Sequence, residues 1–336
     1  MVRKLRSAAQ RLVRLLTSQR YGVFRDRFTR ARATVTKAVT EAIAERTRHD
    51  RAGSEQMPPS GQGIYVFPIS DDIVAEACRR VAVTSPVRQD SGGRTAHALV
   101  TRTDGSRAWL KVSGLSGFNQ DPTRAAEIES ERLTGLAKPA VIRSAEWQED
   151  GVHWRSILMT IASSPAAARQ PWCPPLIADI PDEWFDQLRD ALQAVRQVVT
   201  PRHIYTPDEV HDLIKTYLPA GLPTEADVWC TQHCDLHWSN LTVPNLTLLD
   251  WEVWGVAPLG YGAGRLLVFS LLAPDVAREL ENVFADEFST ASGQVGVLAA
   301  IAVVRKQIEG GTAPKDLEVP IASLVDRIHT GALVKH

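Results

Sequence analysis

The chain has 336 residues, of which 44% are apolar, and its formal net charge is −1. This length suggests two domains or one large domain of two lobes, and the apolar content is sufficient for a sizeable core. No stretch reaches about 18 consecutive apolar residues, so we expect no membrane-spanning helix. The sequence has four cysteines, too few for a disulfide framework, which fits a reducing compartment and predicts a cytoplasmic protein.

The small net charge hides an asymmetry along the chain. Residues 1–55 carry fourteen Lys and Arg against five Asp and Glu, whereas the rest carries twenty-four against thirty-four. Apolar residues recur at helical spacing from Val2 to Leu16 with arginines between them, which predicts a basic amphipathic helix. The helix either packs on the body of the protein or contacts an anionic membrane or nucleic acid. Residues 1–56 are therefore expected to form a basic helical extension and linker.

Strand signals dominate the part of the chain that follows this linker. A helix capped by Ser70 or Asp71 comes first. The apolar runs Ala96–Val100 and Ala108–Val112 then flank a turn, and residues 151–162 indicate a further buried strand. These segments predict a small antiparallel-sheet lobe over residues 57–162.

Helical signals dominate the remainder. One helix is expected earlier, within the sheet lobe, over residues 121–137, where Asp121-Pro122 opens it. The later helices are expected at 182–199, 207–217, 273–290 and 292–309. Strands followed by helices indicate an α+β protein, with a larger helical lobe over residues 163–336.

The segment QHCDLHWSNLTVPNLTLLDWE, residues 232–252, concentrates acids, amides and imidazoles. Asp235 and Asn240 lie among turn-forming residues, and Asp250 follows the apolar run Leu246–Leu249, which reads as a strand. A carboxamide and a carboxylate on adjacent segments can share Mg²⁺, which prefers oxygen ligands. A further carboxylate can orient a hydroxyl and accept its proton. Phosphoryl transfer requires such a set, together with a cation on the phosphates.

The motifs HCDLHWSN (233–240) and DWE (250–252) resemble the catalytic loop of the aminoglycoside phosphotransferase and choline kinase-like family. The resemblance implies a two-lobed protein-kinase-like fold and a small-molecule kinase that uses ATP or GTP with Mg²⁺. It implies that Asp235 is the catalytic base and that Asn240 and Asp250 hold Mg²⁺. Its acceptor would be a hydroxyl of an antibiotic, an amino sugar or a similar metabolite.

The same resemblance assigns further roles to charged residues. Lys111, at the end of the strand in RAWLKV, would hold the nucleotide phosphates. A glutamate on the following helix would pair with this lysine. Glu129 fits the spacing of the family best, and Glu127 is the second choice. His233 would brace the catalytic loop.

Two backbone segments would contact the nucleotide. Ser91, Gly92 and Gly93 lie one hairpin before the lysine, where glycine lets backbone N–H groups approach phosphate oxygens. By resemblance, the backbone of Thr160 and Ala162 would hydrogen-bond the edge of the base.

Two departures from the family pattern bear on activity. Cys234 replaces the glycine common between His and Asp, and Gly262 stands where relatives often carry an aspartate that supports the loop. A weak or inactive kinase-fold binding protein, working through its basic first helix on a membrane or nucleic acid, is therefore the alternative function. Another alternative is a zinc site, for which the closely spaced ligands would be Cys230, His233, Cys234 and His237.

The acceptor and the partners are less defined by the sequence. Acids of the helical lobe permit a cationic acceptor without requiring one, namely Asp182, Glu183, Asp186, Glu279, Glu281, Asp286 and Glu287. Trp238 could stack on a sugar or amine, or belong to the core. We expect a small-molecule hydroxyl substrate and no specific nucleic acid, and residues 1–50 leave open a peripheral membrane contact.

Overall fold

The computed structural model describes residues 69–90, 95–115, 126–331 and 333. All of them fall within the second of two units into which the chain divides, residues 65–336. The basic extension predicted over residues 1–56 lies outside the described residues. Within the described part of the chain, no helix combines the length and apolarity needed to cross a membrane.

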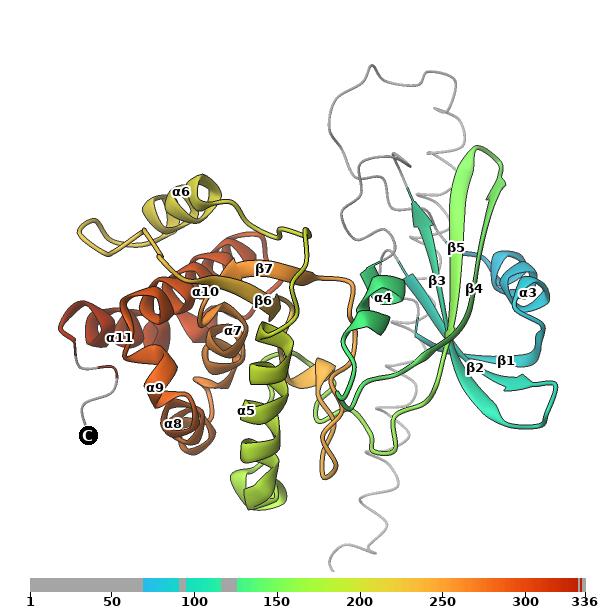
Figure 1. Ribbon diagram of the computed structural model, residues 1–336, viewed down its shortest axis with the longest axis horizontal. Helices are drawn as coiled ribbons and strands as arrows, with labels where there is room; N and C mark the ends of the chain where they lie inside the picture. The colour runs from blue at the N-terminus through green and yellow to red at the C-terminus, as the bar shows by residue number, and fades with distance from the viewer. Residues whose placement is uncertain (1–68, 91–94, 116–125, 332, 334–336) are drawn as a thin grey trace, which may run out of the picture. The chain divides into compact units, whose positions relative to one another are not determined.

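The described chain begins with a helix and a five-stranded antiparallel sheet (Figure 1). Helix α3 (Asp71–Arg80) starts at Ser70, whose hydroxyl accepts a hydrogen bond from the backbone N–H of Ile73 at 3.3 Å, as expected of an N-cap. The strands run in the order β1-β2-β3-β5-β4. Their bounds are β1 (Val83–Asp90), β2 (Thr95–Arg102), β3 (Arg107–Leu115), β4 (Val141–Glu149) and β5 (Val152–Met159).

Alternation along β2 and β3 gives the sheet two different faces. Leu110 and Val112 of β3 pack in an apolar core with Val74 and Ala77 of α3. Successive side chains of a strand point to opposite faces, so Lys111 lies on the other face of the sheet. Lys111 is nevertheless only 4% exposed, because acids from outside the sheet enclose it.

The helix between β3 and β4 ends earlier than predicted. Within the expected range 121–137, helix α4 covers only Ala126–Glu129 and continues as a 3₁₀ turn over Ser130–Arg132; residues 121–125 lie outside the described part. The Ser130 hydroxyl donates to the carbonyl of Glu127 at 2.6 Å and so competes for a helical acceptor. Gly135 then takes a φ of +76°, a left-handed conformation that ends the helical path.

The rest of the chain is mostly helical, as predicted. Three expected helices are present with nearly the expected bounds: α5 (Asp182–Arg196), α6 (Pro207–Tyr217) and α10 (Ala291–Glu309). The helix expected over 273–290 is divided into α8 (Pro274–Val283) and α9 (Ala285–Phe288). The sequence did not predict α7 (Tyr261–Ser270), α11 (Glu318–His329) or the paired strands β6 (Trp229–His233) and β7 (Trp254–Pro258).

Helix α7 was missed because it has no polar face. All ten of its residues are buried, so the amphipathic pattern that reveals a surface helix is absent. Its glycines also lower its helix propensity, but they allow close packing: a Cβ added at Gly264 would lie 3.0 Å from the Cα of Val297 in α10. Helix α7 thereby belongs to a second apolar core, in the helical lobe, and it contacts α10 and β6.

Candidate active site

The loop between β6 and β7 brings the predicted acids and amide together. β6 pairs with β7 at His233 and Trp254, which closes the base of the loop. Inside the loop, the backbone N–H of Leu249 donates to the carbonyl of Asn240 at 2.8 Å. Residues 246–249 are not a regular strand, because only Leu248 forms an isolated bridge. This bridge and the Leu249 bond are nevertheless sufficient to place Asp250 beside Asn240.

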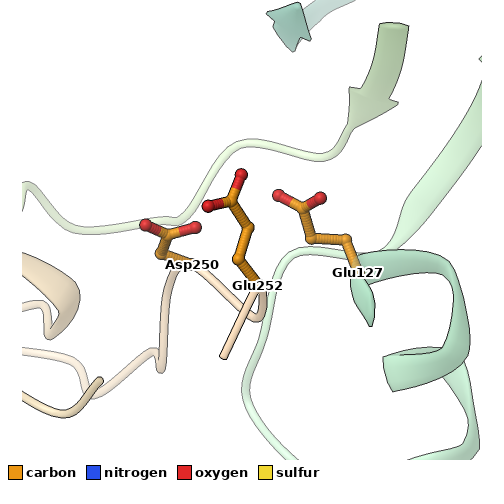
Figure 2. Close-up of side chains that lie close together, drawn as sticks. All are labelled: Glu127, Asp250 and Glu252. Carbon is orange, nitrogen blue, oxygen red and sulfur yellow. The ribbon is translucent and has the colours of Figure 1, made fainter. Parts of the chain in front are cut away.

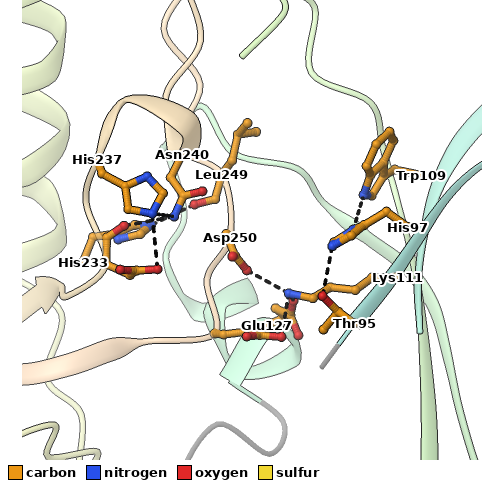
Figure 3. A network of polar contacts seen from close by, with 12 residues as sticks. Thr95, His97, Trp109, Lys111, Glu127, His233, His237, Asn240, Leu249 and Asp250 are labelled. Carbon is orange, nitrogen blue, oxygen red and sulfur yellow. Dashed lines mark hydrogen bonds and ion pairs between the residues drawn. The ribbon is translucent and has the colours of Figure 1, made fainter. Parts of the chain in front are cut away.

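His233 ties the two ends of this loop together. Its Nε2 donates to the carbonyl of Leu249 at 2.8 Å (Figure 3). Its ring packs on Trp251 with 4.6 Å between ring centroids. Burial lowers the pKa of His233, so the neutral ring carries its proton on Nε2. The adjacent Asp250 has a φ of +55°, a strained conformation for a residue with a Cβ. Its carboxylate is thereby turned toward the sheet.

Lys111 meets that carboxylate from the sheet (Figure 3). Figure 2 shows the carboxylates of Glu127, Asp250 and Glu252, which lie close together. Its Nζ lies 2.8 Å from Oδ1 of Asp250, 2.6 Å from Glu127 and 2.6 Å from Glu252. Burial would lower the pKa of Lys111, but the three carboxylates raise it well above its ordinary value. Burial likewise opposes ionisation of Asp250, and the ammonium group outweighs this and lowers the pKa of the carboxyl. Lys111 is therefore a cation held by a surplus of acids.

The partner of this lysine on α4 is Glu127, so the prediction of Glu129 was wrong. Glu129 instead pairs with Arg202, whose Nη2 lies 2.8 Å from its Oε2. The two glutamates are two residues apart in a helical turn and so point in different directions. Glu127 is buried against the sheet, whereas the Glu129 side chain is 41% exposed. The family spacing that favoured Glu129 assumes a helix that continues beyond Arg132, whereas the helical path ends there.

Asp235, the predicted base, forms an ion pair on the other side of the loop. Nη2 of Arg265, on α7, donates to Oδ1 of Asp235 at 2.7 Å. His237 Nε2 lies 3.6 Å from Oδ2. Burial would raise the pKa of Asp235, but His237 and the Arg265 guanidinium hold it well below its usual range. Asp235 is consequently an anion at any physiological pH.

The donor set around Asn240 and Asp250 suits a hard divalent cation. The amide nitrogen of Asn240 donates to the backbone carbonyl of Asp235 at 3.0 Å, which directs its carboxamide oxygen away from that carbonyl. This oxygen and the Asp250 carboxylate are the ligand types that Mg²⁺ takes. The site has four acids and two cations, so it is net negative when all four acids are ionised. The acids are Asp235, Asp250, Glu127 and Glu252, and the cations are Lys111 and Arg265.

A cleft of about 440 Å³ runs past these residues. Lys111, Asn240 and Asp250 line it, as do Thr160 and Ala162 at the end of β5. The backbone N–H of Thr160 already donates to the carbonyl of Ala140 at 3.0 Å, so of its two backbone groups only the carbonyl is left for a ligand in the cleft. The predicted phosphate-covering residues Ser91, Gly92 and Gly93 lie outside the described residues.

The zinc alternative does not agree with the structure. Among the described residues, the group of acids, histidines and cysteines close enough to share an ion is Glu127, Asp250 and Glu252, and it contains neither Cys230 nor Cys234.

Trp238 belongs to the core and does not face a ligand. It is fully buried, stacks on Trp184 and donates to the Ser270 hydroxyl at 2.8 Å.

The two departures from the family motif are accommodated locally. Cys234 is absent from the described residues with positive φ, so its position does not require glycine. The backbone N–H of Gly262 donates to Oε1 of Gln232 at 3.3 Å, and a Cβ there would lie 2.9 Å from the carbonyl oxygen of His233. Gly262 therefore lets α7 approach the backbone of the loop closely.

Sequence reasoning missed three features of the site. Glu252 was part of the motif but was given no role. His97 and Trp109 line the cleft beside Lys111 and are joined by a 3.2 Å hydrogen bond from the indole N–H to Nδ1. Arg265 was also missed, although a lone arginine inside the apolar segment YGAGRLLVFS signals a buried partner.

Comparison with known proteins supports the fold assignment. The sequence matches no protein-family model, and no curated protein matches it. Among solved structures, amicoumacin kinase hAmiN, in complex with AMP-PNP, Ca²⁺ and Ami, matches with a TM-score of 0.51 and 13% identity, over 77% of this chain and 93% of that one. Macrolide 2′-phosphotransferase MphH from Brachybacterium faecium matches with a TM-score of 0.47 and 11% identity, over 75% and 97% of the two chains.

The chain therefore has the two-lobed, protein-kinase-like fold of amicoumacin kinase hAmiN. The antiparallel-sheet lobe and the helical lobe correspond to the α+β arrangement predicted from the sequence. The predicted resemblance to aminoglycoside phosphotransferase-like proteins is thus confirmed for the fold. A shared fold does not determine function, which depends on the side chains of the site.

Proposed function

We propose that this protein is a Mg²⁺-dependent kinase that transfers the γ-phosphate of ATP or GTP to a hydroxyl of a small molecule. The observation that carries the proposal is the contact between Lys111 of the sheet and Asp250 of the loop at 2.8 Å. It brings together a cation that would bind phosphates and a carboxylate that would bind a metal ion, and both line a cleft large enough for a nucleotide. The amicoumacin kinase that shares this fold was solved with AMP-PNP and Ca²⁺, which agrees with nucleotide and divalent-metal use.

Each residue would contribute to the reaction by position and charge. Lys111, held by Glu127, would release one of its three carboxylate partners and bind the phosphates in its place. Asn240 and Asp250 would hold Mg²⁺, which neutralises charge on the phosphates when bound. Asp235 would accept a hydrogen bond from the acceptor hydroxyl and orient it in line with the γ-phosphorus. The carbonyl of Thr160 and the N–H of Ala162 would bind the edge of the base.

The acceptor is proposed only as a class, namely an antibiotic, an amino sugar or a similar metabolite. A polycationic acceptor would need acids that are not already paired. Several acids of the helical lobe have cationic partners, since Asp186 pairs with Arg189, Glu281 with Arg327 and Glu287 with Arg196. The described residues therefore give no reason to prefer a polycationic acceptor over a neutral one.

A phosphotransfer screen tests the proposal. The purified full chain is incubated with Mg²⁺ and γ-labelled ATP or GTP against aminoglycosides, macrolides, peptide antibiotics including amicoumacin, nucleoside antibiotics and amino sugars. We expect label on one class of acceptor, and none with the Asp250→Asn variant. Stabilisation by nucleotide without transfer to any acceptor would instead indicate a binding protein.

A further inference from the structure

A buried arginine holds the carboxylate that orients the acceptor in the proposed function. Arg265 lies on α7, whose residues are otherwise apolar or small, and it is only 4% exposed. Its guanidinium packs over the ring of Phe269 at 5.3 Å, and its Nη2 reaches Oδ1 of Asp235 at 2.7 Å. The side chain of Asp235 is 32% exposed. The arginine thus contacts Asp235 from the protein interior, and the exposed side of the carboxylate remains open.

The geometry points to Arg265 as a positioning residue that fixes the carboxylate of Asp235 relative to the acceptor hydroxyl. This inference rests on the proposed function. A buried guanidinium is costly unless a carboxylate pairs with it, so a rotamer of Asp235 that breaks the pair is strongly disfavoured. One oxygen of Asp235 is occupied by Arg265, and the other is left for His237 and the acceptor. The arrangement fixes the direction from which a hydroxyl can be accepted.

Such a fixed carboxylate acts mainly by orientation. Asp235 paired with a permanent cation is a weak proton acceptor, whereas its oxygen remains a good hydrogen-bond acceptor. Phosphoryl transfer gains most of its rate from positioning and electrostatics, so a weak base is sufficient. Loss of the pair is therefore expected to slow the transfer step and to leave nucleotide binding unchanged.

The chain offers a matched control for this pair. Arg155 of β5 lies 2.8 Å from Glu146 of β4, with side-chain exposures of 3% and 33%. The Arg265–Asp235 pair has a distance of 2.7 Å and exposures of 4% and 32%. Arg155 and Glu146 are paired across β5 and β4 of the sheet and are not part of the loop that carries Asp235. The two pairs are alike in burial and differ in their relation to the site, so comparing them separates positioning from stabilisation.

The test compares Arg265→Met, Arg265→Lys and Arg155→Met in the full chain. Three quantities are measured: kcat for Mg-ATP with the acceptor from the screen and with water, the Kd of Mg-ATP, and the unfolding temperature. We expect Arg265→Met to lower kcat about 100-fold with the Kd of Mg-ATP changed less than about twofold. Arg265→Lys keeps the charge without the planar geometry and is expected to recover about a tenth of wild-type kcat. Arg155→Met is expected to lower the unfolding temperature and to retain kcat.

Several results would overturn this assignment. Wild-type kcat in Arg265→Met would refute it, as would equal losses of kcat in Arg265→Met and Arg155→Met. If Arg265→Met does not fold, Arg265→Lys must show the fall in kcat at unchanged Kd, and a normal kcat there refutes the assignment. A wild-type chain that transfers phosphate to neither an acceptor nor water refutes the proposed function and this inference together. An active wild type with unaffected Arg265 variants refutes this inference alone.

Discussion

Two charged centres at the loop between β6 and β7 are built in opposite ways. At Lys111, one buried cation is shared by three carboxylates, one from α4 and two from the loop between β6 and β7. At Asp235, one carboxylate is held by one buried arginine of the helix behind the loop. The first centre has a surplus of negative charge, and the second is a balanced pair.

This difference indicates how each centre functions. A cation with three acidic partners can release one of them to a phosphate and remain paired, and the released acid is then available to a divalent ion. A one-to-one pair that is buried on one side has no such exchange, because breaking it leaves an unpaired charge in the interior. The Lys111 centre is therefore suited to binding and release, and the Asp235 centre to fixed orientation.

The largest effect is expected from Asp250→Asn, which removes a negative charge from the Lys111 centre and leaves the shape of the side chain nearly unchanged. We expect phosphotransfer to fall by about 10³-fold or more, because the metal site loses its principal anion. The fold should be retained, since Lys111 keeps two carboxylates. The measurement is kcat together with Mg²⁺-dependent stabilisation by AMP-PNP, which should be lost. Unchanged turnover would remove Asp250 from the site.

A smaller effect is expected from Asp235→Asn in the balanced pair. The carboxamide can still accept a hydrogen bond but no longer neutralises Arg265, so kcat is expected to fall about 10²-fold to 10³-fold. The Kd of Mg-AMP-PNP, measured by calorimetry, should stay within about twofold of wild type. A large loss of nucleotide affinity would show that Asp235 belongs functionally to the Lys111 centre instead.

The smallest effects come from the two glutamates of α4, which form a matched pair of variants. Glu127→Gln removes a direct partner of Lys111 and is expected to raise the KM for ATP about tenfold. Glu129→Gln affects only the partly exposed pair with Arg202, so kcat and KM should not change, and the free energy of unfolding should fall by less than about 1 kcal/mol. Steady-state kinetics at varied ATP distinguishes them. A larger rise of the KM for ATP in Glu129→Gln than in Glu127→Gln would instead support Glu129 as the partner of Lys111, as the sequence predicted.

The sequence predicted those parts of the site that lie close together in the chain. Asp235, Asn240 and Asp250 fall within sixteen residues, and one loop brings them together through the Leu249 and His233 bonds to its backbone. Lys111 was found because the resemblance requires a lysine near the end of an upstream strand, and the segment RAWLKV supplies one. Glu129 was chosen over Glu127 because the choice assumed a long helix, and the actual turn ends after Arg132.

The unpredicted parts depend on contacts between distant segments. Arg265 is thirty residues from Asp235 and lies in a helix that has no polar face, so neither periodicity nor spacing indicated it. The position of Glu252, the third acid at Lys111, depends on the direction that the chain takes after Asp250, whose φ is left-handed. Such a backbone angle follows from the packing around it and is not visible in the residue type. The roles assigned to Ser91, Gly92 and Gly93 stay predictions.

A crystal structure of the full chain with AMP-PNP and Mn²⁺ would show whether Lys111, Asn240 and Asp250 hold a metal–nucleotide complex. The anomalous signal of Mn²⁺ should lie between Asp250, the carboxamide oxygen of Asn240 and the phosphates, with Nζ of Lys111 on a phosphate oxygen. The Asp235–Arg265 pair should be unchanged from the structure described here. A nucleotide bound elsewhere, or a metal ion away from Asp250 and Asn240, would contradict the account.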